Sequence, residues 1–168
     1  MSIRYGFQRL VLINSAGYDR AEVPLDDSVS LVAPNNAGKT SLINALQYLL
    51  IVDQRHMDFG AHSLEASRWF YFPDNAAYIL LEISLPEAGT FVIGCVGKGV
   101  GGDYEYFVYS GALRTEDFCR EDGSMVTQPR LQEHMSTRDR LVEKYSATDF
   151  ADMIYAGRRS QRSRREAP

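Results

Sequence analysis

The sequence has few of the residues that build metal sites or disulfide frameworks. Its 168 residues include two cysteines and three histidines, and none of these stands at a spacing typical of metal ligands. We therefore interpret Cys95 and Cys119 as structural thiols of a reducing compartment. Long hydrophobic runs are also missing, because the longest, around residues 46–52, is too short and too interrupted to span a bilayer. The first residues hold no apolar signal core. We therefore expect a cytoplasmic protein that makes no membrane contact.

Positive charge is scarce outside one segment. The chain has a net charge of −4, but residues 158–168 contain five Arg and one Glu, which leaves −8 on residues 1–157. Such an acidic body is not typical of a free-standing DNA-binding domain. Residues 158–168 have no apolar face and predict a basic disordered tail. We favour a solvated tail over a tether for nucleic-acid phosphates.

The sequence does contain a phosphate-binding pattern near residue 35. An apolar run over residues 29–32 leads into a loop of small residues that ends in Gly-Lys-Thr, and a helical pattern follows at once. Strand, loop and helix in this order form the context that a P-loop requires. Backbone N–H groups of such a loop wrap a phosphate, a lysine adds charge, and a hydroxyl can ligate Mg²⁺. We predict Thr40 as the Mg²⁺ ligand. The predicted nucleotide-binding residues are Asn35, Asn36, Ala37, Gly38, Lys39, Thr40 and Ser41.

Two other functions stay open, and the first of them rests on a departure from the usual G-x-x-x-x-G-K-[ST] pattern. Ala33 stands where the first glycine belongs. A degenerate P-loop domain used for protein–protein contact is therefore one alternative. Another is a small self-contained P-loop kinase or nucleotidase, which would need its own carboxylate and a lid of arginines.

The remaining periodicity predicts an α/β fold with a mixed α+β sheet. Strands are expected over residues 4–13, 21–24, 77–85, 90–96 and 104–110, and the turn residues 86–89 predict an antiparallel hairpin. Apolar spacing predicts a helix from near Lys39 to Leu50. Beyond residue 113 we expect helices over roughly 129–135, 138–145 and 147–155. Residues 53–75 show no period and predict a long functional or mobile loop beside the nucleotide site.

The sequence lacks the groups that ATP hydrolysis needs beyond a P-loop. Hydrolysis requires a carboxylate that follows an apolar strand. The nearest candidate, Glu82, lies in a predicted hairpin strand with no second carboxylate after it, and we interpret it as an exposed or edge-strand residue. A signature close to Leu-Ser-Gly-Gly-Gln is also missing. We therefore predict no catalytic residue in this chain, which holds half of a site.

The order of these elements resembles the N-terminal lobe of an ABC/SMC-type P-loop ATPase head. More narrowly, three segments resemble the SMC-like subunits of bacterial MukB/MksB/JetC-type complexes, which include condensin-like chromosome machinery and the Wadjet plasmid-defence system. These segments are Leu-Leu-Ile-Val-Asp at 49–53, Phe-Tyr-Phe-Pro-Asp at 70–74 and Tyr-Ile-Leu-Leu-Glu at 78–82. The resemblance covers roughly residues 3–110.

This resemblance implies an ATPase function that the chain would perform only together with another lobe and other subunits. Its cofactors would be ATP and Mg²⁺, and a C-terminal lobe of the same head would bring the missing carboxylates and signature. Two heads would sandwich ATP and act on double-stranded DNA with a kleisin-type subunit, at the bacterial nucleoid. Gln128 is the best-placed candidate for the family's Q-loop glutamine, a further Mg²⁺ ligand. Arg55 and Arg68 are the DNA-binding candidates.

The resemblance also suggests a division of the chain into three parts. Residues 1–113 would form a P-loop nucleotide-binding lobe with an antiparallel β-subdomain. Residues 114–157 would be a helical extension that leads toward a coiled coil absent from this chain, and residues 158–168 would be the basic tail. The chain would then be an ATP-binding half-head, and we expect the isolated chain to be inactive as an ATPase.

Overall fold

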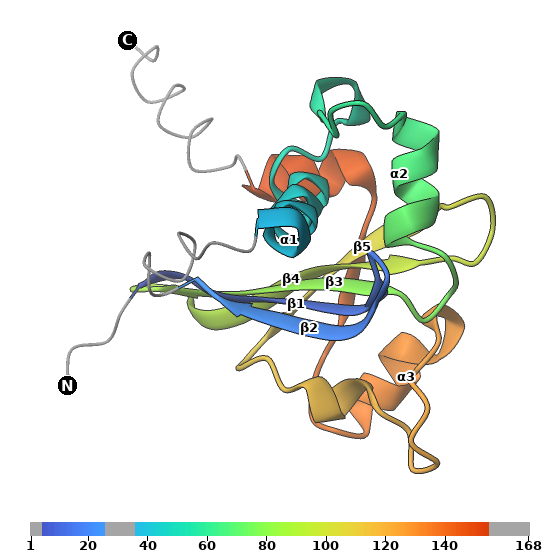
Figure 1. Cartoon of the computed structure of the whole chain (residues 1–168). Helices are drawn as coiled ribbons and strands as arrows, with labels where there is room; N and C mark the ends of the chain where they lie inside the picture. The colour runs from blue at the N-terminus through green and yellow to red at the C-terminus, as the bar shows by residue number, and fades with distance from the viewer. Residues whose placement is uncertain (1–4, 26–35, 155–168) are drawn as a thin grey trace, which may run out of the picture.

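The fold is built on an antiparallel sheet. The computed structural model describes residues 5–25 and 36–154, and for residues 36–39 only the backbone. Within these ranges six strands form one sheet in the order β2-β1-β3-β4-β5-β6, and every neighbouring pair is antiparallel (Figure 1). The strands are β1 (Gly6–Ser15), β2 (Tyr18–Pro24), β3 (Tyr78–Leu85), β4 (Gly89–Gly97), β5 (Tyr104–Ser110) and β6 (Glu143–Tyr145).

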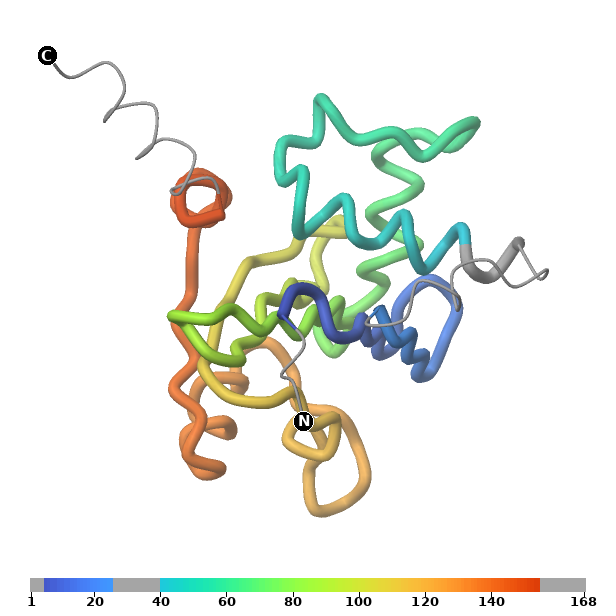
Figure 2. Tube along the Cα trace, turned by 90° about the vertical axis from the view of Figure 1, so that its left-hand side faces the viewer, coloured from blue at the N-terminus to red at the C-terminus, as the bar shows by residue number. Residues whose placement is uncertain are grey.

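Helices cover both faces of this sheet. One face carries α1 (Asn36–Leu50), α2 (Leu64–Tyr71) and a helix over residues 147–154, and the short turn η2 (Gln54–His56) follows α1 (Figure 1). The other face carries η3 (Thr115–Phe118), η4 (Gln128–Arg130) and α3 (Leu131–Ser136). Figure 2 shows that the chain leaves α3, passes the edge of the sheet and reaches the face that carries α1. The described residues therefore form three layers.

Both faces of the sheet are apolar because both are covered. Side chains alternate along β1, so that Leu10 and Leu12 enter the core beneath α1 while Val11 and Ile13 enter the core beside α3. Phe150, from the helix over residues 147–154, also enters the first core. Each of these side chains is almost fully buried and contributes roughly 1.5–3 kcal/mol to folding.

Most of the predicted elements are confirmed. The chain has the mixed α+β class, the hairpin of β3 and β4 is antiparallel, and β5 follows it where expected. The predicted helix exists as α1, but it begins at Asn36, so the Gly-Lys-Thr motif lies inside the helix and not at the end of a loop as predicted. The strand predicted over residues 29–32 lies outside the described residues.

Two predictions about regions without clear periodicity are wrong. Residues 53–75 are not one long loop, because they contain η2 and also α2, whose first turn is capped by the Ser63 hydroxyl accepting from the Ala66 N–H at 3.0 Å. Residues 138–145 do not form a helix. The chain turns at Asp139, with φ of 61°, and then pairs as β6 with β5. The edge of β5 supplies backbone partners there, and this tertiary pairing overrides local propensity.

The interpretation of Glu82 as an exposed or edge-strand residue is also wrong. Glu82 lies in β3, a central strand, and its side chain is only 12% exposed. Its carboxylate accepts from the Leu113 N–H at 2.6 Å and lies 3.6 Å from the Arg9 guanidinium. Along β3, Glu82 alternates with residues that pack beneath α1, so it faces the opposite side of the sheet. Glu82 therefore anchors the segment after β5 and lies on the opposite face from α1.

Substitution of Gly94 should measure how tightly the sheet and its α3 side are packed. A Cβ at this position in β4 would lie 2.6 Å from Phe107 Cζ and 2.9 Å from Leu80 Cδ2. We expect Gly94→Ala to reduce the free energy of unfolding by about 1–3 kcal/mol, the usual cost of overpacking. Urea denaturation followed by circular dichroism measures this. Val100→Ala, at a position that is 70% exposed, is the control and should leave the midpoint unchanged. An unchanged midpoint for Gly94→Ala would contradict the packing described here.

Candidate functional site

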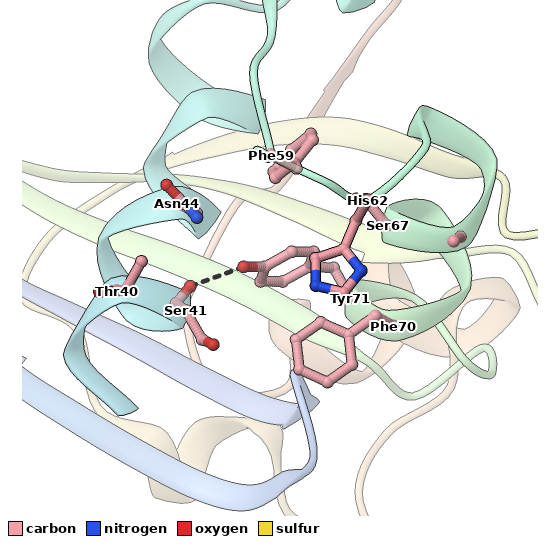
Figure 3. Close-up of a pocket in the computed structure, with 9 residues that line it drawn as sticks. Thr40, Ser41, Asn44, Phe59, His62, Ser67, Phe70 and Tyr71 are labelled. Atoms are coloured by element: carbon pink, nitrogen blue, oxygen red, sulfur yellow. Dashed lines mark hydrogen bonds between the residues drawn. The ribbon is translucent and has the colours of Figure 1, made fainter. Parts of the chain in front are cut away.

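A cavity of about 590 Å³ opens between α1 and α2. This volume lies within the range of small-molecule sites in proteins. In Figure 3, side chains from α1 stand on one side, and side chains from α2 and the loop before it stand on the other. The cavity is lined by Thr40, Ser41, Asn44, Phe59, His62, Ala66, Ser67, Phe70 and Tyr71.

The α1 wall of the cavity follows from the helix's apolar spacing. Leu42, Ala45 and Leu49 are buried against the sheet. Because side chains three and four positions apart share one face of a helix, Thr40 and Asn44 are left on a different side, which borders the cavity. The burial of α1 therefore determines which polar side chains reach the cavity.

The loop between η2 and α2 is fastened to α1 by one side chain. The Gln47 amide donates to the Asp58 carbonyl at 2.7 Å, and its oxygen accepts from the Asp58 N–H at 2.7 Å. This pair of hydrogen bonds places the next residue, Phe59, in the cavity wall, where its ring stacks on Tyr48 with centroids 5.4 Å apart. His62 follows on the same loop, and its imidazole points into the cavity (Figure 3).

The last turn of α2 is fastened at two points. The Tyr71 hydroxyl donates to the Ser41 carbonyl of α1 at 2.7 Å (Figure 3). The turn between β1 and β2 holds the backbone, because the Ala16 N–H donates to the Phe70 carbonyl at 2.9 Å and the Ser15 hydroxyl donates to the Tyr71 carbonyl at 2.7 Å. These contacts fix the distance between the two helical walls.

Buried phenols pack behind two of the lining rings, because Tyr48 contacts Phe59 and Tyr71, and Tyr104 contacts Tyr48. Burial raises the pKa of Tyr71 to about 12, and it raises the pKa of Tyr104 to about 12 as well. The pKa of Tyr48 is raised above its ordinary value by burial, while the nearby Arg68 charge acts in the opposite direction. These phenols are therefore neutral near pH 7, and the Tyr71 hydroxyl can donate its hydrogen bond over the whole physiological range.

The predicted phosphate-binding residues are only partly within the described part of the chain. Asn35 lies outside it, and for residues 36–39 only the helical backbone is described. Thr40 and Ser41 both line the cavity. The first turn of α1 contains no acidic residue, so no carboxylate opposes the positive end of the helix dipole there.

The two DNA-binding candidates do not line this cavity. Arg55 lies in η2, is 85% exposed, and pairs with Asp53 at 2.8 Å, which helps to lower the pKa of Asp53 to about 2. Arg68 lies in α2 and is half-buried. Its Nε is buried and has no hydrogen-bond partner among the described residues.

Gln128, the candidate for a further Mg²⁺ ligand, also lies away from the cavity. It belongs to η4, where its amide donates to the Glu105 carboxylate at 2.9 Å and its N–H donates to the Asn75 carbonyl at 2.8 Å. These contacts tie η4 to β5 and to the segment before β3. The cavity therefore brings together Thr40 and Ser41, and it includes neither Gln128 nor the two arginines.

Several cavity residues were not among the predicted site residues. They are Asn44, Phe59, His62, Ala66, Ser67, Phe70 and Tyr71. The one available signal was the cluster of aromatic residues at 70–72 within a polar stretch, which indicated a functional region without specifying side chains. Across the described ranges, no group of His, Cys, Asp and Glu is arranged to hold a metal ion. No helix in the same ranges is long and apolar enough to cross a membrane.

Fold and cavity together define a mixed α+β domain with a ligand-sized site beside the start of α1. A family model described as "Putative Mks condensin complex protein MksF" matches residues 1–147. The chain belongs to this family, which confirms the resemblance to condensin-like proteins. Comparison with curated proteins gave no match, and comparison with solved structures gave none.

Removal of the Tyr71 hydroxyl should weaken the join between the cavity walls. We expect Tyr71→Phe to lower the free energy of unfolding by about 0.5–1.5 kcal/mol, because the Ser41 carbonyl loses its side-chain donor. Urea denaturation measures the change. The matched control is Tyr5→Phe, at a residue that is 52% exposed. Equal stability of the two variants would show that the hydrogen bond does not hold α2 to α1.

Proposed function

We propose that this chain is the ATP-binding lobe of an SMC-like ATPase head in a condensin complex. One observation carries the proposal: the Gly-Lys-Thr motif enters the start of α1, and the same helix places Thr40 and Ser41 on the wall of a ligand-sized cavity. A helix N-terminus favours phosphate because its free N–H groups and dipole attract anions. The family's membership in a condensin complex supports a role shared with other subunits.

The described residues fit a bound nucleotide with Mg²⁺. The cavity has a suitable volume, a threonine hydroxyl at its edge, and no carboxylate among its lining residues or in the first turn of α1. Lys39 would carry the charge that faces the phosphates, and Thr40 would hold the Mg²⁺ ion. Mg²⁺, when bound, would neutralise charge on the phosphate oxygens. The free backbone N–H groups at the start of α1, from Asn35 to Gly38, would surround the phosphates, because the N–H groups of later residues bond within the helix.

Hydrolysis would require groups from outside this chain. Glu82, the nearest carboxylate to follow an apolar run, faces the opposite side of the sheet from α1. A C-terminal lobe would bring the carboxylates and the signature, and a second head would close over ATP. Nucleotide binding would then drive dimerisation of two heads, and hydrolysis would open them. In this scheme the lobe would also include the elements after residue 113, because β6 pairs with β5 and Phe150 enters the core beneath α1.

Double-stranded DNA and a kleisin-type subunit would be the remaining partners. Arg55 supports DNA contact because its side chain is almost fully exposed on a short turn. The complex would organise chromosomes or act against plasmids at the bacterial nucleoid.

Removal of the P-loop lysine tests the nucleotide assignment. We expect Lys39→Ala to weaken binding of Mg-ATP by about 10- to 100-fold, because a hydrogen bond to a charged group contributes roughly 1.5–3 kcal/mol. Isothermal titration calorimetry on the full chain, and on the chain joined to its C-terminal lobe, measures the affinity. Lys98→Ala, at an exposed lysine in the turn after β4, is the matched control and should leave affinity unchanged. Unchanged ATP affinity in Lys39→Ala would disprove the P-loop assignment.

Charge reversal at Arg55 tests the DNA contact. We expect Arg55→Glu to weaken binding of double-stranded DNA by the ATP-dimerised complex. The slope of log affinity against log salt concentration should fall in magnitude by about 1–2, because fewer phosphate contacts release counterions. Fluorescence anisotropy over a salt series measures both quantities. Arg130→Glu, in η4 on the other face of the sheet, serves as the control. Binding that is absent, or that does not respond to salt, would refute the DNA-binding role.

A further inference from the structure

The far wall of the cavity has a chemistry that phosphate binding does not explain. Phosphates are held by charge and N–H groups, which the start of α1 offers. The side opposite α1 instead includes four rings, those of Phe59, His62, Phe70 and Tyr71, beside the small residues Ala66 and Ser67 (Figure 3). These rings offer flat apolar faces that suit a planar ligand group.

The cavity also extends in the direction that a nucleotide would require. Thr40, Ser41 and Asn44 line it one after another along α1, away from the helix N-terminus. The helix rises about 1.5 Å per residue, so Asn36 and Asn44 are separated by about 12 Å along the axis. A ligand anchored by its terminal phosphates at the start of α1 could therefore place its other end between the aromatic walls.

Two of the rings are free to receive such a ligand. Phe70 has a large apolar side chain, yet 45% of it is exposed. Its backbone is held in place by the hydrogen bond that its carbonyl accepts from the Ala16 N–H. The His62 side chain is exposed and has no hydrogen-bond or ion-pair partner among the described residues. The exposed Phe70 ring and the His62 imidazole therefore leave planar faces open to a ligand in the cavity.

We propose that this aromatic cavity is the nucleobase subsite, in which the base of the bound nucleotide stacks on Phe70 and lies beside His62. The proposal rests on the proposed nucleotide-binding function and adds the part of the ligand that the P-loop does not recognise. The base then contributes affinity that is independent of the phosphates. Asn44, which also lines the cavity, supplies an amide that can hydrogen-bond the sugar or the edge of the base.

The test compares two probes, Mg-ATP and Mg-tripolyphosphate, which has the phosphate chain but no nucleoside. Both are titrated into the full chain and into Phe70→Ala, and affinity is followed by calorimetry or by amide NMR shifts. We expect Phe70→Ala to weaken Mg-ATP binding by about tenfold, within the range of base–aromatic stacking, and to leave tripolyphosphate binding unchanged. Phe70→Trp, which keeps a stacking ring, should retain ATP affinity.

The matched control is Trp69→Ala. Trp69 is the preceding residue of α2, is 47% exposed and does not line the cavity, so its removal should change neither affinity. Unchanged ATP affinity in Phe70→Ala would overturn the base subsite and leave the proposed function standing. Equal loss for both probes would also overturn it, because the ring would then act on the phosphate end or on folding. If the unaltered chain, alone or joined to its C-terminal lobe, bound neither probe, the proposed function itself would fail.

Discussion

The arrangement of the site depends on the burial of Tyr48 in the middle of α1. Its ring contacts the rings of Phe59, Tyr71, Phe72 and Tyr104, with centroids 5.1–5.4 Å away, and only 1% of the residue is exposed. Its backbone carbonyl accepts from the Tyr106 hydroxyl at 2.8 Å. One residue therefore joins α1 to the sheet, to the loop before α2 and to α2 itself. Because all walls of the cavity share this anchor, the polar side of α1 and the aromatic side of α2 keep a fixed separation.

The two faces of the sheet carry different kinds of side chain near their centre. The face under α1 supports the cavity, whereas the other face holds Glu82 in contacts with Arg9 and with the Leu113 backbone. These contacts fasten the segment that leads to α3, and a carboxylate committed to them is poorly placed to serve a ligand beside α1. The carboxylate of Glu82 therefore stabilises the fold on the face opposite the cavity.

The sequence predicted those parts of the fold whose signals are local. The apolar spacing from Leu42 to Leu50 specified α1, and the turn residues at 86–89 specified the β3–β4 hairpin. The α2 wall of the cavity was harder to predict from the sequence. The helix has only eight residues, and its cap, Ser63, stands in a stretch without periodicity. His62 and Phe59 reach the cavity only through the long-range contact of Gln47 with Asp58. β6 was missed for the same reason, since its conformation is set by pairing with β5 and not by its own three residues.

A crystal structure of the complete head with Mg²⁺ and a non-hydrolysable ATP analogue would locate the nucleotide. We expect the phosphates at Gly38, Lys39 and Thr40, and the base between His62 and Phe70. A nucleotide bound elsewhere, with the cavity beside Thr40 left empty of it, would disprove the proposed site.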